Sequence, residues 1–166
     1  MIFVTVGNAT QGFRRLLDAV DILAGEKAWG NETVFIQSGN NPGFRPAYCK
    51  HEPFVPMDDF ALKFQEAAVI VSHAGTGTLF HALQAGKVPV VMPRRKKYGE
   101  IIDDHQLELV QALASEGRVI PAYEPMELPA AIAEARQRTP GSALSPSTEM
   151  HQLVAKAFEE LMRERV

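Results

Sequence analysis

The chain has 166 residues, of which 46% are hydrophobic and 22% charged, a balance typical of globular proteins and not of disordered, collagen-like or low-complexity chains. Its 17 basic and 20 acidic residues give a net charge of −3, which argues against a general nucleic-acid binder. Cys49 is the only cysteine, so no intrachain disulfide forms, and we expect a reducing, cytoplasmic setting. No membrane-spanning stretch is visible, and the first residues are typical of a strand and not of a signal peptide.

Predicted strands and helices alternate along the chain. Short β-branched runs predict strands, whereas apolar residues spaced three and four apart predict helices. The alternation predicts one Rossmann-like α/β domain over residues 1–138, a parallel sheet with helices on both faces. In chain order, strands are predicted at residues 2–6, 33–37, 48–55, 69–71, 88–92 and 119–120, and helices at 13–23, from Asp58 or Asp59 to 67, from the 76–78 region to 85, at 103–115 and at 128–138.

Residues 139–166 form a separate predicted segment. Pro, Gly and Ser residues over 139–147 predict a linker. A stripe of apolar residues from Met150 to Met162 predicts an amphipathic helix over about 148–163. This helix either packs on the parent domain or docks on a partner, and the sequence leaves both alternatives open.

Three polar or Gly-rich loops follow predicted strands: Gly7–Gln11, Ser38–Gly43 and Ser72–Thr78. Ligands bind at the carboxyl ends of the strands in such sheets, so we expect these loops to line one crevice. The third loop leads from a buried strand into a helix N-terminus, where free N–H groups and the helix dipole favour an anion such as phosphate. The alternative is a tight turn with His73 as an interior residue. The loop lacks the signatures of a P-loop or of a dinucleotide fingerprint.

Residues 72–78, 86–93 and 103–106 together resemble the donor-binding half of GT-B glycosyltransferases, and more narrowly the family 28 glycosyltransferase C-terminal domain. The similarity extends from Ile2 to about Ser115. Within this family the chain resembles subunits of two-chain enzymes: the bacterial exopolysaccharide subunits of the PssE type and the small catalytic subunit of the dolichol-linked N-acetylglucosaminyltransferase. The run at 93–100 resembles the bacterial group in particular.

The resemblance implies a UDP-sugar donor site with no further cofactor. The loop from Gly7 to Gln11 would face the phosphates and the acceptor. Relatives usually carry Glu at the position of His81 for the ribose, and a neutral imidazole accepts only one hydrogen bond there. The implied donor-binding residues are Gly7 and Gln11; Phe54 and Val55 beside the uracil; His73, Ala74, Gly75, Thr76, Gly77 and Thr78 beside the diphosphate; His81; and Asp104, His105 and Gln106 beside the sugar hydroxyls.

Two segments near the site have alternative interpretations. Asp103 and Gln106 have the spacing of a capping box, which would give this segment a purely structural role. The basic run at 94–97 is typical of a solvated loop, and the functional alternative is attraction to an anionic lipid or a lipid-diphosphate acceptor. Glu100, Asp103 and Asp104 have side chains that can bind a cation. Carboxylates are also favourable at a helix N-terminus, which explains them without a metal, so no metal is predicted.

The resemblance implies the donor-binding, catalytic subunit of an inverting glycosyltransferase that acts on a lipid-linked saccharide in surface polysaccharide assembly. No clear catalytic base is visible; it is expected from a membrane-anchored, acceptor-binding partner, with His105 as a candidate in this chain. Such a partner would recruit the chain to the inner face of the membrane, and the isolated chain could form a homo-oligomer through the same surface. The alternatives are a non-catalytic nucleotide-sugar-binding subunit, a UDP-sugar hydrolase and an epimerase.

Overall fold

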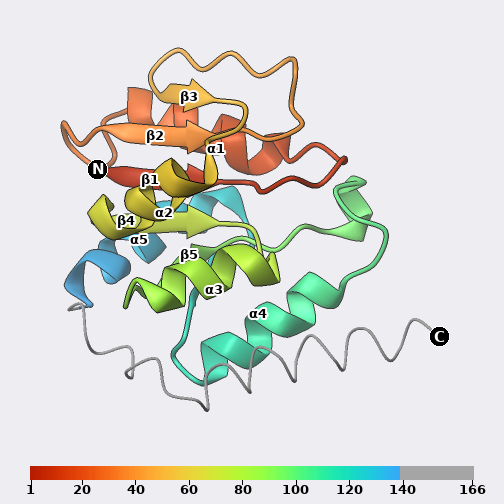
Figure 1. The fold of residues 1–166 in the computed structure, drawn as a ribbon. Helices are drawn as coiled ribbons and strands as arrows, with labels where there is room; N and C mark the ends of the chain where they lie inside the picture. Colours follow the sequence, from red (N-terminus) through yellow and green to blue (C-terminus); the bar gives the residue numbers. More distant parts are fainter. Residues whose placement is uncertain (139–166) are drawn as a thin grey trace.

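The computed structural model describes residues 1–138, which form a six-stranded parallel sheet with helices on both faces (Figure 1). The strand order is β3-β2-β1-β4-β5-β6, so the Rossmann-like fold expected from the sequence is confirmed. The strands are β1 (Ile2–Thr5), β2 (Val34–Gln37), β3 (Lys50–Glu52), β4 (Val69–Ser72), β5 (Val90–Val91) and β6 (Ile120–Pro121). The helices are α1 (Arg14–Gly25), α2 (Met57–Glu66), α3 (Thr76–Gln84), α4 (His105–Ser115) and α5 (Leu128–Gln137), with short 3-10 turns η1 (Lys96–Tyr98) and η2 (Pro125–Glu127).

Strand order places a crevice between two central strands. The chain builds the sheet outward from β1 to β3 and then returns to place β4 on the other side of β1. Ile2 of β1 is in register with Val34 of β2 on one side and with Val69 of β4 on the other. The connections that follow β1 and β4 leave the carboxyl ends of these strands in opposite directions. Parallel sheets of this kind bind ligands in the crevice between two such strand ends.

Two sets of helices cover the two faces of the sheet. Apolar residues of α1 and α5 pack with Val4 and Val71 in one core. On the other face, Phe64 of α2 packs on Phe3, while α3 and α4 share a smaller cluster around Leu79. Figure 1 shows the two sets on opposite sides of the strands. All four residues of β1 and of β4 are buried, as expected for strands covered on both faces.

Several boundaries differ from the sequence predictions for local reasons. The third strand covers Lys50–Glu52 and not 48–55, and the fifth covers Val90–Val91 and not 88–92. Pro53 and Pro89 border these strands and lack the N–H that continued pairing requires. The helix predicted to start at residue 58 or 59 starts at Met57. Asp58 and Asp59 lie in its first turn, where their negative charges interact favourably with the helix dipole.

Within residues 1–138, no helix combines the length and the apolar character that crossing a bilayer requires. The predicted linker over 139–147 and the predicted helix over 148–163 lie outside the described residues, so their placement stays a prediction.

Candidate functional site

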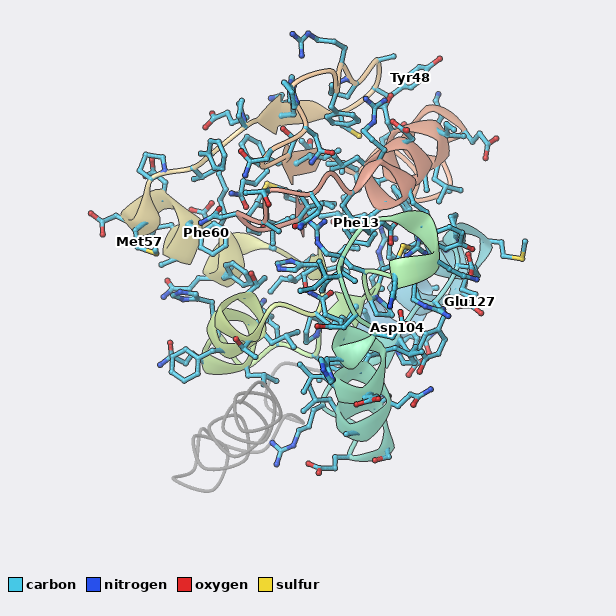
Figure 2. All side chains as sticks on the ribbon, turned by 90° about the vertical axis from the view of Figure 1, so that its right-hand side faces the viewer. Phe13, Tyr48, Met57, Phe60, Asp104 and Glu127 are labelled. Carbon is cyan, nitrogen blue, oxygen red and sulfur yellow. The ribbon has the colours of Figure 1, made fainter. Side chains whose placement is uncertain are left out.

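A cavity of about 340 Å³ opens at the carboxyl ends of β1 and β4, at the crevice that the strand order creates. The loop after β1, the turn between β4 and α3, and the start of α2 surround it. It is lined by Gly7, Asn8, Gln37, Val55, Met57, Phe60, His73, Gly75, Thr76, Gly77, Thr78 and His81. Figure 2 looks onto this edge of the sheet, with Met57 and Phe60 toward one side and Phe13 and Asp104 toward the other.

His73 is held tightly between two glycines at the floor of the cavity. A Cβ atom on Gly7 would lie 2.7 Å from Nε2 of the imidazole, and one on Gly75 would lie 2.7 Å from Cε1. Both distances are too short for carbon beside a ring, so only glycine fits at either position. Gly7 also has a φ of 67°, in the left-handed region that glycine adopts without strain. The two glycines therefore allow the backbone of both loops to approach the imidazole.

The imidazole of His73 is neutral at physiological pH. Only 7% of the residue is exposed, and burial lowers its pKa from 6.5 to about 4, with a further lowering from the nearby charge of Arg94. Its Nδ1 atom is buried without a hydrogen-bond partner among the described residues. The sequence alternatives for His73 were an interior residue and a ligand contact. The structure shows a buried ring that borders the cavity, and contact with a ligand stays a prediction.

The N-terminus of α3 forms one side of the cavity. Helix α3 begins at Thr76, so the N–H groups of Thr76, Gly77 and Thr78 have no partner within the helix. Its first turn carries no acidic residue that would occupy this positive end. A Cβ atom on Gly77 would have no atom within 4 Å, so the backbone there is open. The helix N-terminus predicted at this point is confirmed, and phosphate binding stays a prediction.

The opposite wall of the cavity is apolar and aromatic. Val55, Met57 and Phe60 contribute to it, from the start of α2 and the segment before it. The ring of His81 packs edge-on against Phe60, with centroids 5.7 Å apart, and lies 5.8 Å from the ring of Phe64. His81 is therefore placed at the rim by aromatic packing. Phe54, the neighbour of Val55, is 51% exposed and does not line the cavity.

One polar lining residue, Gln37, was missed in the sequence analysis. Gln37 is 3% exposed; its amide oxygen accepts a hydrogen bond from the Thr5 hydroxyl, and its Nε2 donates to Oδ1 of Asn8 at 3.4 Å. Gln37 ends a predicted strand and Asn8 lies in the loop that was expected to line the crevice, so strand adjacency was the available signal. The loop at 38–43 was expected to line the crevice, but none of its residues lines the cavity. Its Asn40 side chain instead donates hydrogen bonds to the carbonyls of Asn8 and Ala9 in the neighbouring loop.

Besides Phe54 and Ala74, four of the predicted donor-binding residues lie outside this cavity: Gln11, Asp104, His105 and Gln106. His105 begins α4, with its N–H donating to Asp103 Oδ1 and its Nδ1 3.5 Å from a carboxylate oxygen of Glu108. The predicted capping box is absent here, because the side chain of Gln106 instead accepts from the N–H of Arg94 at 3.1 Å. Ala74 is also outside, 3% exposed in the α3–α4 core.

The basic run at 94–97 is only partly the solvated loop that its composition suggests. Arg94 is 1% exposed, and its guanidinium donates to backbone carbonyls. Lys96 and Lys97 remain exposed. Glu100 is 5% exposed and accepts two hydrogen bonds from Arg15, each 2.9 Å, so its charge is already neutralised. In the described part of the chain, no three metal-ligating side chains form a cluster.

Comparison with known proteins gives a consistent result. The chain matches the glycosyltransferase family 28 C-terminal domain over residues 1–164. It is 31% identical over 124 residues to the UDP-N-acetylglucosamine transferase subunit ALG13 of Yarrowia lipolytica, a match covering 68% of this chain and 60% of that protein. It is 32% identical over 127 residues to the human subunit of the same name, covering 71% of this chain and 10% of that protein. The chain thus corresponds to only part of these curated relatives.

Solved structures share the fold at lower identity. The kitacinnamycin glycotransferase superposes with a TM-score of 0.60 at 19% identity, covering 98% of this chain and 38% of that one. MurG of Acinetobacter baumannii superposes with a TM-score of 0.51 at 20% identity, covering 92% of this chain and 49% of that one. In both cases the chain corresponds to less than half of the larger protein.

Proposed function

The chain belongs to the glycosyltransferase family 28 C-terminal domain family, and from this premise we propose that it binds a UDP-sugar in the cavity at the ends of β1 and β4. One observation carries the proposal. The free N–H groups at the start of α3 face a cavity whose floor is formed by His73 and two glycines that let backbone approach a ligand closely. This is the arrangement that a diphosphate requires.

The walls of the cavity suggest how the donor lies. The diphosphate binds to the N–H groups of Thr76, Gly77 and Thr78. The nucleoside lies toward the apolar wall of Val55 and Phe60, with the ribose near His81. The sugar extends toward the side of the sheet edge where Gln11, Asp104, His105 and Gln106 lie, outside the cavity itself.

The reaction proposed is inverting transfer of a hexosyl residue, of the glucuronosyl, galactosyl or N-acetylglucosaminyl type, to a lipid-linked saccharide in surface polysaccharide biosynthesis. N–H groups preorganised at a helix terminus stabilise the negative charge that develops on the leaving diphosphate. The acceptor hydroxyl needs a base, which a membrane-anchored acceptor-binding partner supplies at the cytoplasmic face of the membrane. Within this chain, His105 is the candidate base, because it lies between two carboxylates at the same edge of the sheet.

A second candidate function is a nucleotide-sugar-binding subunit that does not itself catalyse. The observation in its favour is that, among the described residues, no Asp or Glu lines the cavity. Both candidates require the same donor site, and they differ in whether this chain takes part in the transfer step. A hydrolase or an epimerase would instead act on the donor without a lipid-linked acceptor.

Thermal unfolding with and without UDP tests the site. UDP should raise the melting temperature of the wild type, because a ligand that binds only the folded state stabilises it. His73→Ala should lose this increase, whereas His51→Ala, on strand β3 beside Phe44 and away from the cavity, should keep it. An equal increase in both variants would count against the site.

An activity assay separates the candidate functions. The chain is mixed with a co-purified partner, a lipid-linked acceptor and several UDP-sugars. Product that requires both chains and disappears in His105→Ala supports catalysis by this subunit. Product that requires both chains but persists in His105→Ala indicates a base on the partner. Product formed by the partner alone supports the binding subunit, and UDP release without acceptor supports a hydrolase.

A further inference from the structure

Arg94 is the most deeply buried charged residue of the described chain, and the proposed donor contacts do not involve it. Its side chain is 1% exposed, and its guanidinium lies 4.8 Å from the centre of the Phe13 ring, labelled near the middle of the sheet edge in Figure 2. Burying a guanidinium is costly unless hydrogen bonds satisfy it. The partners of Arg94 therefore indicate what this burial achieves.

The partners are backbone carbonyls from two different loops. Nη2 of Arg94 donates to the carbonyl of Val6 at 3.0 Å, directly before Gly7. Nη1 donates to the carbonyls of Gln11 at 2.8 Å and Gly12 at 3.2 Å, and also to that of Glu100 at 3.2 Å. One side chain thus binds both ends of the loop at 7–11 and connects this loop to the segment that leads into α4.

The backbone of Arg94 adds a third segment. Its N–H donates to the side chain of Gln106 in the first turn of α4. The loop that Arg94 binds also forms one wall of the narrow slot around His73, where Gly7 has no room for even a Cβ atom. A small displacement of this loop changes the shape of the cavity at the imidazole.

From these contacts we infer that Arg94 is a positioning residue for the donor site: it holds the 7–11 loop against His73 and aligns Gln106 with that loop. The inference rests on the proposed function, since it concerns the same nucleotide-sugar cavity. Arg94 does not line the cavity itself and acts through the backbone that it binds. Guanidinium suits this role because its donors point in several fixed directions, whereas an ammonium group is a single point of charge.

Arg15 provides a matched control. It is also mostly buried, with 12% of its side chain exposed, and it also lies near the Phe13 ring. It binds the same segment that follows β5, through the carbonyl of Pro93 and the carboxylate of Glu100. None of its hydrogen bonds reaches the 7–11 loop. Loss of the Arg15 side chain should therefore destabilise the same region of the fold but leave the hydrogen bonds to the 7–11 loop in place.

The experiment compares UDP affinity with fold stability in Arg94→Lys and Arg15→Lys of the full chain. Both variants should melt at a lower temperature than the wild type. Titration calorimetry below those temperatures should show the Kd for UDP increased about tenfold in Arg94→Lys, the equivalent of one lost hydrogen bond, and changed by less than about threefold in Arg15→Lys. An unchanged Kd in Arg94→Lys, or equal increases in both variants, would overturn the inference.

A measurement on the wild type covers the case in which Arg94→Lys does not fold. Buried guanidinium N–H protons exchange with water slowly enough to be observed by NMR. Their chemical shifts depend on the position of the carbonyls that accept their hydrogen bonds. Saturating UDP should shift the Arg94 Nη–H signals and leave those of Arg15 in place, and Arg94 signals that do not move would overturn the inference. If the wild type does not bind UDP at all, the proposed function fails and the inference with it; binding that is indifferent to Arg94 refutes the inference alone.

Discussion

Lowering the pH should destabilise the folded protein through the buried imidazole of His73. This side chain has a pKa of about 4 in the folded state and 6.5 when exposed, mainly because burial penalises the charged form. Between these two values the unfolded chain binds a proton that the folded chain does not. The contribution of neutral His73 to stability is therefore complete above about pH 6.5 and is lost as the pH falls toward 4.

The size of the effect follows from the two pKa values. One pKa unit corresponds to about 1.4 kcal/mol of differential stability. The difference between 6.5 and about 4 therefore corresponds to roughly 3 kcal/mol when the pH is far below both values. Most of this loss, roughly 2–3 kcal/mol, should occur between pH 7.5 and pH 4.5. It is a substantial part of the 5–15 kcal/mol that stabilises a typical domain.

Urea denaturation at pH 7.5, 6.5, 5.5 and 4.5 measures this contribution when the wild type is compared with His73→Asn, which cannot titrate. Carboxylates and the other histidines change both proteins alike, so the difference in unfolding free energy isolates His73. That difference should shrink by roughly 2–3 kcal/mol from pH 7.5 to pH 4.5. The same substitution at His51, a half-buried residue on β3, is the control for the change from histidine to asparagine. Parallel curves for the wild type and His73→Asn would refute the reasoning.

Two further pairs of substitutions test the packing of the site and the effect of burial on ion pairs. Gly7→Ala should reduce the unfolding free energy by about 1–3 kcal/mol, because the residue has φ 67° and no room for Cβ. Gly77→Ala, with open space around it, should be neutral or stabilising by about 0.5–1 kcal/mol in the same denaturation assay; similar losses in both would contradict this. Glu100→Gln should cost about 1.5–3 kcal/mol, because the buried guanidinium of Arg15 loses the carboxylate that accepts two of its hydrogen bonds. Asp18→Asn, in an exposed ion pair, should cost less than about 1 kcal/mol, and calorimetric melting curves that shift equally would show that burial does not decide the difference.

Local patterns in the sequence were sufficient for the architecture. Alternating β-branched runs and helical periodicities predicted the parallel sheet, and a strand followed directly by small residues predicted the helix N-terminus at Thr76. The family resemblance rested on the same local segments, and the match over residues 1–164 confirmed it. These features were predictable because hydrophobic periodicity and helix starts depend on residues within a few positions of one another.

The surroundings of the site depended on residues far apart in the chain. The sequence predicts Arg94 in an exposed basic loop. In the structure its side chain is buried and donates hydrogen bonds to carbonyls more than 80 positions earlier in the chain. Gln106 has the spacing of a capping residue, yet its partner is a backbone N–H twelve positions earlier. Gln37 becomes part of the cavity only because β2 ends beside β1. A buried polar group must find its hydrogen-bond partner wherever the fold brings one within reach, and that choice is made by tertiary packing.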